Sequence, residues 1–114
     1  MKIIKQNIKI EEFEQMAQKM YGNLVKAVVD VEKEVMAVDG DLHADEEALL
    51  IEKGSNQKNL WGINLYPEFK NSKNFIEFDS IINLRPSQGN RTRSIDDLEV
   101  QKKIRKIVNK LATK

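Results

Sequence analysis

A stretch rich in arginine, glycine and small polar residues runs from Ile82 to Ser94. Gly89 and Asn90 can adopt positive φ at little cost, which would let successive backbone N–H groups point into one concavity. Guanidinium groups add forked donors that match phosphate or carboxylate oxygens. We therefore predict an anion-binding turn. Its predicted contact residues are Arg85, Ser87, Gln88, Gly89, Asn90, Arg91 and Arg93.

The same arginines also fit a purely structural role. Arginines beside a turn can pair with carboxylates, here Glu77, Asp79 or the acids of a neighbouring helix, and so fix the loop. In that case the glycine serves backbone geometry alone. The sequence leaves both interpretations of the turn open.

The only histidine of the chain, His43, provides a second group with chemical potential. Its unperturbed pKa lies near neutrality, so it could act as a general acid or base together with Glu46 or Glu47. His43 and Glu47 are four residues apart, which is half of the geometry of a helical metal site. The alternative is a first helical turn whose acids complement the helix dipole while His43 caps or packs.

Alternating polar residues give the predicted sheet one open face. A solvated face is the usual explanation for such alternation in an antiparallel sheet. Carboxylates on that face could also hold a divalent cation through oxygen ligands. We predict no resident metal and name no cofactor. The carboxylates that could take a cation are Asp30, Glu77 and Asp79.

Composition excludes several classes of site. The 114 residues include 19 basic and 18 acidic ones, a net charge of +1, so any binding to nucleic acid would depend on a local patch. There is no cysteine, which removes disulfides and thiolate chemistry. No apolar run approaches the roughly 20 residues of a membrane span. We expect a cytoplasmic protein without a membrane partner.

Periodicity along the chain predicts the elements that must position these residues. Apolar residues at spacings of three and four indicate helices, and β-branched runs indicate strands. Residues 2–9 are expected to be an extended lead-in, and Ser94 to cap the last helix. The expected elements are helix 10–21, strands 24–31 and 35–38, helix 44–53, strands 60–66 and 75–84, and a final helix after residue 94.

The order α-β-β-α-β-β-α predicts a single α+β domain over residues 1–114. Short connections favour a four-stranded, mainly antiparallel sheet with the helices on one face. The middle helix would also permit a crossover between the second and third strands.

Several segments together resemble a small prokaryotic family of domains of unknown function. The resemblance covers nearly the whole chain and implies a prokaryotic protein, but it brings no activity or catalytic residue. The segments are LHADEE (42–47), GS (54–55), LWGIN (60–64), IEFDS (76–80) and INLRPSQGNR (82–91).

Three functional classes follow from these observations. The first is a binding or interaction module with a small anionic ligand at the 85–93 turn. The second is a hydrolase of a phosphoester or nucleotide, with His43 or Glu47 as acid–base group and the arginines stabilising negative charge. The third is a structural homo-oligomer that pairs through the open sheet face or an edge strand. Nucleic acid is a weaker expectation because few aromatic residues fall on the polar face.

Overall fold

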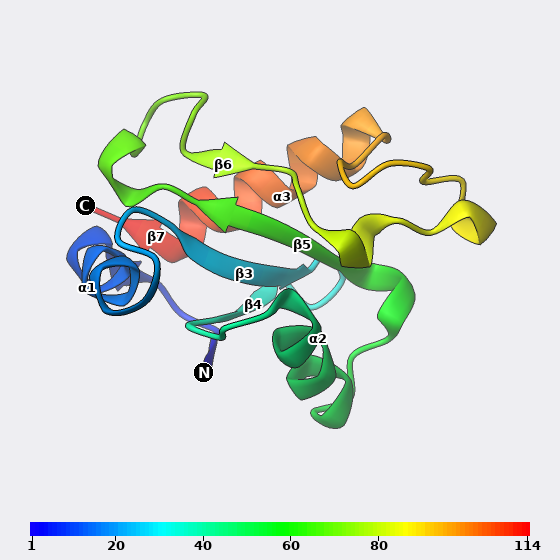
Figure 1. Ribbon diagram of the computed structural model, residues 1–114, viewed down its shortest axis with the longest axis horizontal. Helices are drawn as coiled ribbons and strands as arrows, with labels where there is room; N and C mark the ends of the chain where they lie inside the picture. Colours follow the sequence, from blue (N-terminus) through cyan, green and yellow to red (C-terminus); the bar gives the residue numbers. More distant parts are fainter.

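One antiparallel sheet with the strand order β1-β4-β3-β5-β6 forms the centre of the molecule (Figure 1). The structure is a computed structural model that describes residues 1–114. A second, two-stranded sheet pairs β2 with β7 in parallel. The strands are β1 (Lys2–Ile4), β2 (Ile8–Lys9), β3 (Val25–Asp30), β4 (Val35–Val38), β5 (Leu60–Leu65), β6 (Ile76–Glu77) and β7 (Ala112–Thr113).

The α+β class and the mainly antiparallel sheet are confirmed, but the predicted count of four strands is wrong. The extended lead-in, residues 2–9, supplies the additional edge strand β1, which pairs with β4. Three residues are too few for a periodic signal in the sequence, and their pairing depends on a partner far along the chain.

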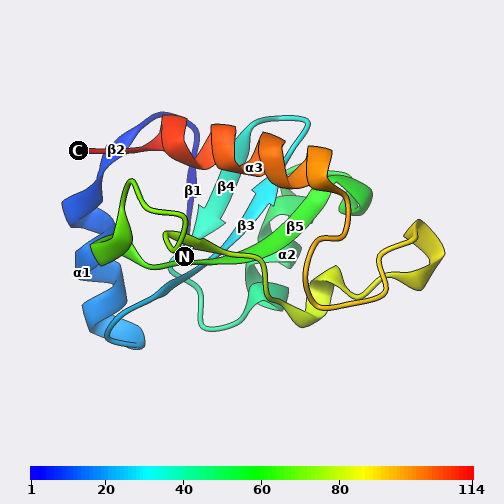
Figure 2. The same cartoon turned by 90° about the horizontal axis from the view of Figure 1, so that it is seen from above.

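The helices α1 (Ile10–Met20), α2 (His43–Glu52) and α3 (Leu98–Leu111) cover both faces of the sheet (Figure 2). α1 and α3 share one apolar core with β3 through Val25, Ala27 and Val29. α2 lies on the opposite face, where its Leu50 packs on Val28 of β3. The expectation of helices on one face is therefore wrong.

The position of α2 follows from the strand directions. Both β4 and β5 run antiparallel to β3, so the chain must pass over β3 to connect them. α2 makes this crossover and covers the face that α1 and α3 leave open. The remaining part of that face, beside the start of α2, carries the polar side chains of Lys26, Asn64 and Glu77.

The predicted long strand 75–84 is also wrong, because only β6 is a strand within it. The chain then turns into a short 3-10 helix, Ile81–Asn83. The N–H of Ile82 in this helix donates to the Ser80 hydroxyl at 3.3 Å. Side chains of serine and asparagine compete in this way with the backbone pairing that a strand needs.

Other predicted elements need smaller corrections or none. The first helix, the β3–β4 hairpin, the second helix and β5 are confirmed. The last helix begins later than expected, because Asp97 and not Ser94 is its N-cap and accepts the Glu99 N–H at 2.9 Å. None of the helices has the length and apolar character needed to cross a membrane.

Candidate functional site

Arg85, the first arginine of the predicted anion-binding turn, is 9% exposed and bonded to backbone oxygens. Its Nε donates to the oxygen of Ile82 at 2.9 Å and its Nη1 to the oxygen of Gln57 at 3.0 Å. Its Nη2 donates to the oxygen of Leu60. The guanidinium carbon lies 4.5 Å from the centre of the Trp61 ring. These contacts tie the turn to the start of β5.

The acid on α2 that faces Arg85 is Glu47. Its carboxylate lies 3.8 Å from Nη2 of Arg85, with only 14% of the Glu47 side chain exposed. Burial lowers the pKa of Arg85, and the charge of Glu47 opposes that shift. Glu47 thus compensates a buried cation, which is a role in stability.

The middle of the turn is held by Asn90, a buried residue. Its Nδ2 donates to the backbone oxygens of Asn83 at 2.6 Å and Ser94 at 2.8 Å. Its Oδ1 accepts the N–H of Asp96 at 2.8 Å. Gly89 has the positive φ expected of it, 82°, whereas Asn90 does not adopt a positive φ. Asn90 therefore organises the loop from inside.

The carboxylate of Asp96 already binds the next hydrogen-bond donors of the turn, at residues 91 and 92. Asp96 accepts the N–H of Arg91 at 3.1 Å and the hydroxyl of Thr92 at 2.9 Å. The Gln88 side-chain amide reaches the oxygen of Lys58 at 3.5 Å. The side chains of Ser87 and Arg91 are exposed and make no hydrogen bond. The anion-binding role of this turn stays a prediction, and its free charged donors are on Arg91 and Arg93.

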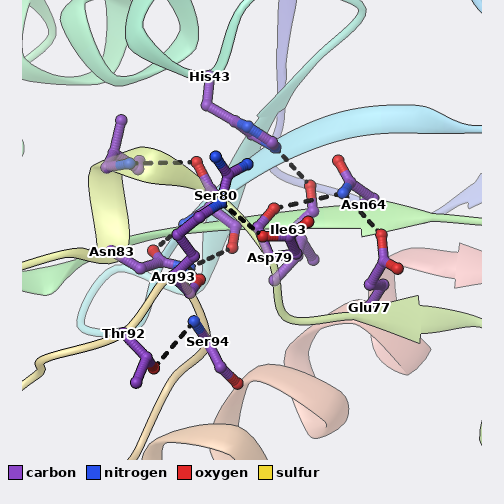
Figure 3. A network of polar contacts seen from close by, with 12 residues as sticks. His43, Ile63, Asn64, Glu77, Asp79, Ser80, Asn83, Thr92, Arg93 and Ser94 are labelled. Atoms are coloured by element: carbon purple, nitrogen blue, oxygen red, sulfur yellow. Dashed lines mark hydrogen bonds and ion pairs between the residues drawn. The ribbon is translucent and has the colours of Figure 1, made fainter.

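His43 lies at the start of α2 as its first residue, one position before the predicted boundary at residue 44. Its side chain is buried and points toward Ile63 (Figure 3). Nε2 lies 2.8 Å from the backbone oxygen of Ile63. Because a carbonyl can only accept, Nε2 must carry the proton, which leaves a lone pair on Nδ1 of the neutral ring. Burial lowers the pKa of His43, so the neutral ring is the form present at neutral pH.

An ion pair lies beside the histidine, at the end of the arginine turn. Nε of Arg93 donates to Oδ1 of Asp79 at 2.8 Å, with 58% and 46% of the two side chains exposed. Among the charges that act on the pKa of His43, Lys26 lowers it most, Asp79 raises it and Arg93 lowers it. The structure therefore brings the only histidine together with one of the predicted arginines.

Asn64 extends this cluster across the sheet (Figure 3). Its Nδ2 donates to Oε1 of Glu77 at 2.9 Å and to the backbone oxygen of Asp79 at 3.3 Å. Its Oδ1 is buried and has no partner. The Tyr66 hydroxyl also donates to Glu77, at 3.1 Å. Burial, followed by this bond to the Glu77 carboxylate, raises the pKa of Tyr66.

We call His43, Asn64, Glu77, Asp79 and Arg93 the polar cluster. The predicted strand alternation places Asn64, Glu77 and Asp79 on the polar face, but the position of His43 beside them depends on the crossover of α2. The sequence carries no local signal for that position.

The remaining carboxylate candidates lie apart from the polar cluster or are already bonded. Asp30 accepts the backbone N–H groups of Glu32 and Lys33, both at 2.9 Å, and the Ser55 hydroxyl at 2.6 Å. No group of three or more His, Cys, Asp or Glu side chains is arranged to hold a metal ion. Glu46 is buried, and its Oε2 accepts the N–H of Gly40 at 2.9 Å.

Comparison with known proteins places the chain in a family. It belongs to the family described as protein of unknown function (DUF5674), whose family model matches residues 2–111. This confirms the resemblance to a family of unknown function. No curated protein and no solved structure matches the chain.

Proposed function

We propose that this protein is a small binding module whose ligand carries an anionic group and a hydrogen-bond donor. Arg93 binds the anionic group, and Nδ1 of His43 accepts the donor. The observation that carries this proposal is that a neutral, buried histidine and a half-exposed arginine, whose charge acts on the pKa of that histidine, lie in the same group of polar side chains beside the start of α2 (Figure 3).

The donors of Arg93 support the first half of the proposal. Only its Nε is used in the ion pair with Asp79, so both Nη groups remain for a ligand. Hydrogen bonds from an arginine to an ionised oxygen are stronger than neutral ones, and the fork of the guanidinium fits phosphate and carboxylate. Arg91, exposed two residues away, adds positive charge at the same end of the turn.

The fixed tautomer of His43 supports the second half. Its Nε2–H is bound to Ile63, so the ring cannot turn that proton toward a ligand without breaking a buried hydrogen bond. Nδ1 is not hydrogen-bonded within the protein. A hydroxyl or amide of the ligand would satisfy it, and a ligand that lacks this donor would leave the lone pair unpaired, which costs affinity.

A titration with glycerol 2-phosphate and inorganic phosphate at constant ionic strength tests this proposal. We expect the ring ¹⁵N signals of His43 to shift saturably with glycerol 2-phosphate. Arg93→Gln should weaken that binding by about tenfold or more, the loss expected for one charge-assisted hydrogen bond. The matched control Lys103→Gln removes one positive charge on the exposed face of α3 and should leave it unchanged. Unshifted His43 signals in the wild type would refute the proposal.

A hydrolase acting on a phosphoester is the second candidate, favoured by the lowered pKa of His43, which leaves it available as a general base. Binding remains the first proposal, because it requires only the hydrogen-bond donors of Arg93 and the acceptor of His43. Hydrolysis of p-nitrophenyl phosphate that is lost in both His43→Gln and Arg93→Gln would favour the hydrolase. Absence of turnover in the wild type would remove it.

A further inference from the structure

A cavity of about 300 Å³ lies between α3 and the loop that leads into β6. The loop contributes Asn71, Ser72 and Lys73, and α3 contributes Arg105 and Asn109. No acidic residue lines it. Small-molecule sites begin at roughly this volume. The cavity is lined by α3, and the polar cluster lies on the α2 side of the sheet, so the two sites are separate.

Positive charge at this cavity has no internal counterion. Lys70, Lys73 and Arg105 take part in none of the ion pairs of the molecule. Nζ of Lys70 donates to Oδ1 of Asn109 at 3.0 Å, which holds the ammonium group beside the cavity. Burial, and then the charge of Lys114, lowers the pKa of Lys70. An anion bound in the cavity would offset the repulsion between the positive charges of Lys70 and Lys114.

Two of these cations are also held in place by aromatic rings. Nζ of Lys70 lies 5.0 Å from the centre of the Phe75 ring, and the guanidinium carbon of Arg105 lies 4.9 Å from that of Phe78. Such contacts orient a cation and lower the entropy it loses on binding a ligand. They also occupy the ring faces on which a nucleic acid base would stack.

We propose that this cavity, the α3 pocket, binds the phosphate group of a small phosphorylated compound. Lys73 and Arg105 supply the charge, while the amides of Asn71 and Asn109 and the Ser72 hydroxyl line the remaining space and offer further donors. A small compound fits better than a nucleic acid strand, because the site is a hollow and the nearby rings are already covered by cations.

The experiment is a titration of the full chain with inorganic phosphate, followed by ¹H–¹⁵N NMR against sodium chloride of equal ionic strength. We expect saturable shifts of the backbone amides of residues 71–73 and 109. The double variant Lys73→Gln/Arg105→Gln should weaken binding by at least about tenfold, because two charge-assisted contacts are lost. The matched control Lys2→Gln/Lys103→Gln removes the same charge elsewhere and should bind as the wild type does.

Three outcomes would overturn the proposal that the α3 pocket binds a phosphate group. The first is a wild-type spectrum that responds to phosphate no more than to chloride. The second is an equal loss of binding in the control variant, which would mean non-specific attraction. The third is tighter binding of a single-stranded RNA oligomer with shifts along the whole of α3, which would replace the pocket by a nucleic acid surface. His43 reports on the polar cluster and residues 71–73 on this pocket, so failure of one proposal is distinguishable from failure of the other.

Discussion

The side-chain amide of Asn83 pairs with both backbone polar groups of Gly62. Oδ1 accepts the Gly62 N–H at 2.8 Å, and Nδ2 donates to the Gly62 oxygen at 2.9 Å. A neighbouring strand would satisfy the same two groups with its own backbone. Glycine is needed there, because a Cβ at position 62 would lie 2.6 Å from Cβ of Ser80. One side chain thus takes the place of a strand at the open edge of β5.

Replacing Asn83 by alanine should therefore destabilise the protein strongly. Asn83 is fully buried, so its loss leaves the Gly62 N–H and oxygen without partners. Leaving a buried polar group unpaired costs about 1–3 kcal/mol, and we expect a loss of roughly 2–4 kcal/mol in the free energy of unfolding. Urea denaturation measures it. The matched control is Asn74→Ala at an exposed position, and equal stability of the two variants would contradict the pairing.

This pairing also explains why the longest predicted strand failed. Residues 75–84 alternate between apolar and polar types as a strand does, and sequence periodicity registers that alternation alone. The side chains of Ser80 and Asn83 bond to backbone groups, and these bonds form in place of a continued ladder of strand hydrogen bonds. Elements with sustained periods, such as the β3–β4 hairpin and the first helix, were predictable because local pattern and tertiary packing agree.

The start of α3 shows a further limit of prediction. Ser94 and Asp97 are both good capping residues, and no local rule separates them. Asn90 determines which of the two residues caps the helix. Its side chain bonds to the oxygen of Ser94 and the N–H of Asp96 and so holds residues 94–96 in the loop. In the candidate site, the sequence indicated His43 and Arg93 but not that the fold brings them into one group of polar side chains. The α3 pocket was not anticipated, because its loop and helix are distant in the sequence.

Replacement by methionine should lower the stability of the protein strongly at Arg85 and hardly at all at Arg91. Arg85→Met removes the donors to the oxygens of Ile82, Gln57 and Leu60 and leaves Glu47 without its partner. Breaking a buried pair of this kind costs about 3–5 kcal/mol. Arg91→Met changes an exposed side chain without contacts and should stay within about 0.5 kcal/mol of the wild type.

Thermal and urea unfolding of the two single variants check this difference. If Arg85→Met were as stable as the wild type, the buried contacts of its guanidinium would contribute nothing and the structural role of Arg85 would be wrong. A large loss in Arg91→Met would point to a contact of that side chain that the structure lacks.

Glu46 should make the protein less stable as the pH rises. Burial raises the pKa of Glu46 to about 9, and its Oε1 has no partner. In the unfolded chain the carboxyl group ionises with its ordinary pKa of 4.5. The folded state therefore holds a proton that the unfolded state has released, and the stability present below pH 4.5 is lost as the pH rises toward 9. The slope is at most about 1.4 kcal/mol per pH unit.

The measurement is urea unfolding of the wild type and of Glu46→Gln at several pH values between 7 and 8.5, a window above the lowered pKa of His43. Glutamine is neutral throughout and keeps an acceptor for the N–H of Gly40. We expect the wild type to lose stability across this window, while Glu46→Gln stays constant and exceeds it at pH 8.5. A slope that is the same in both proteins would mean that Glu46 ionises normally within the fold and that water reaches its carboxylate.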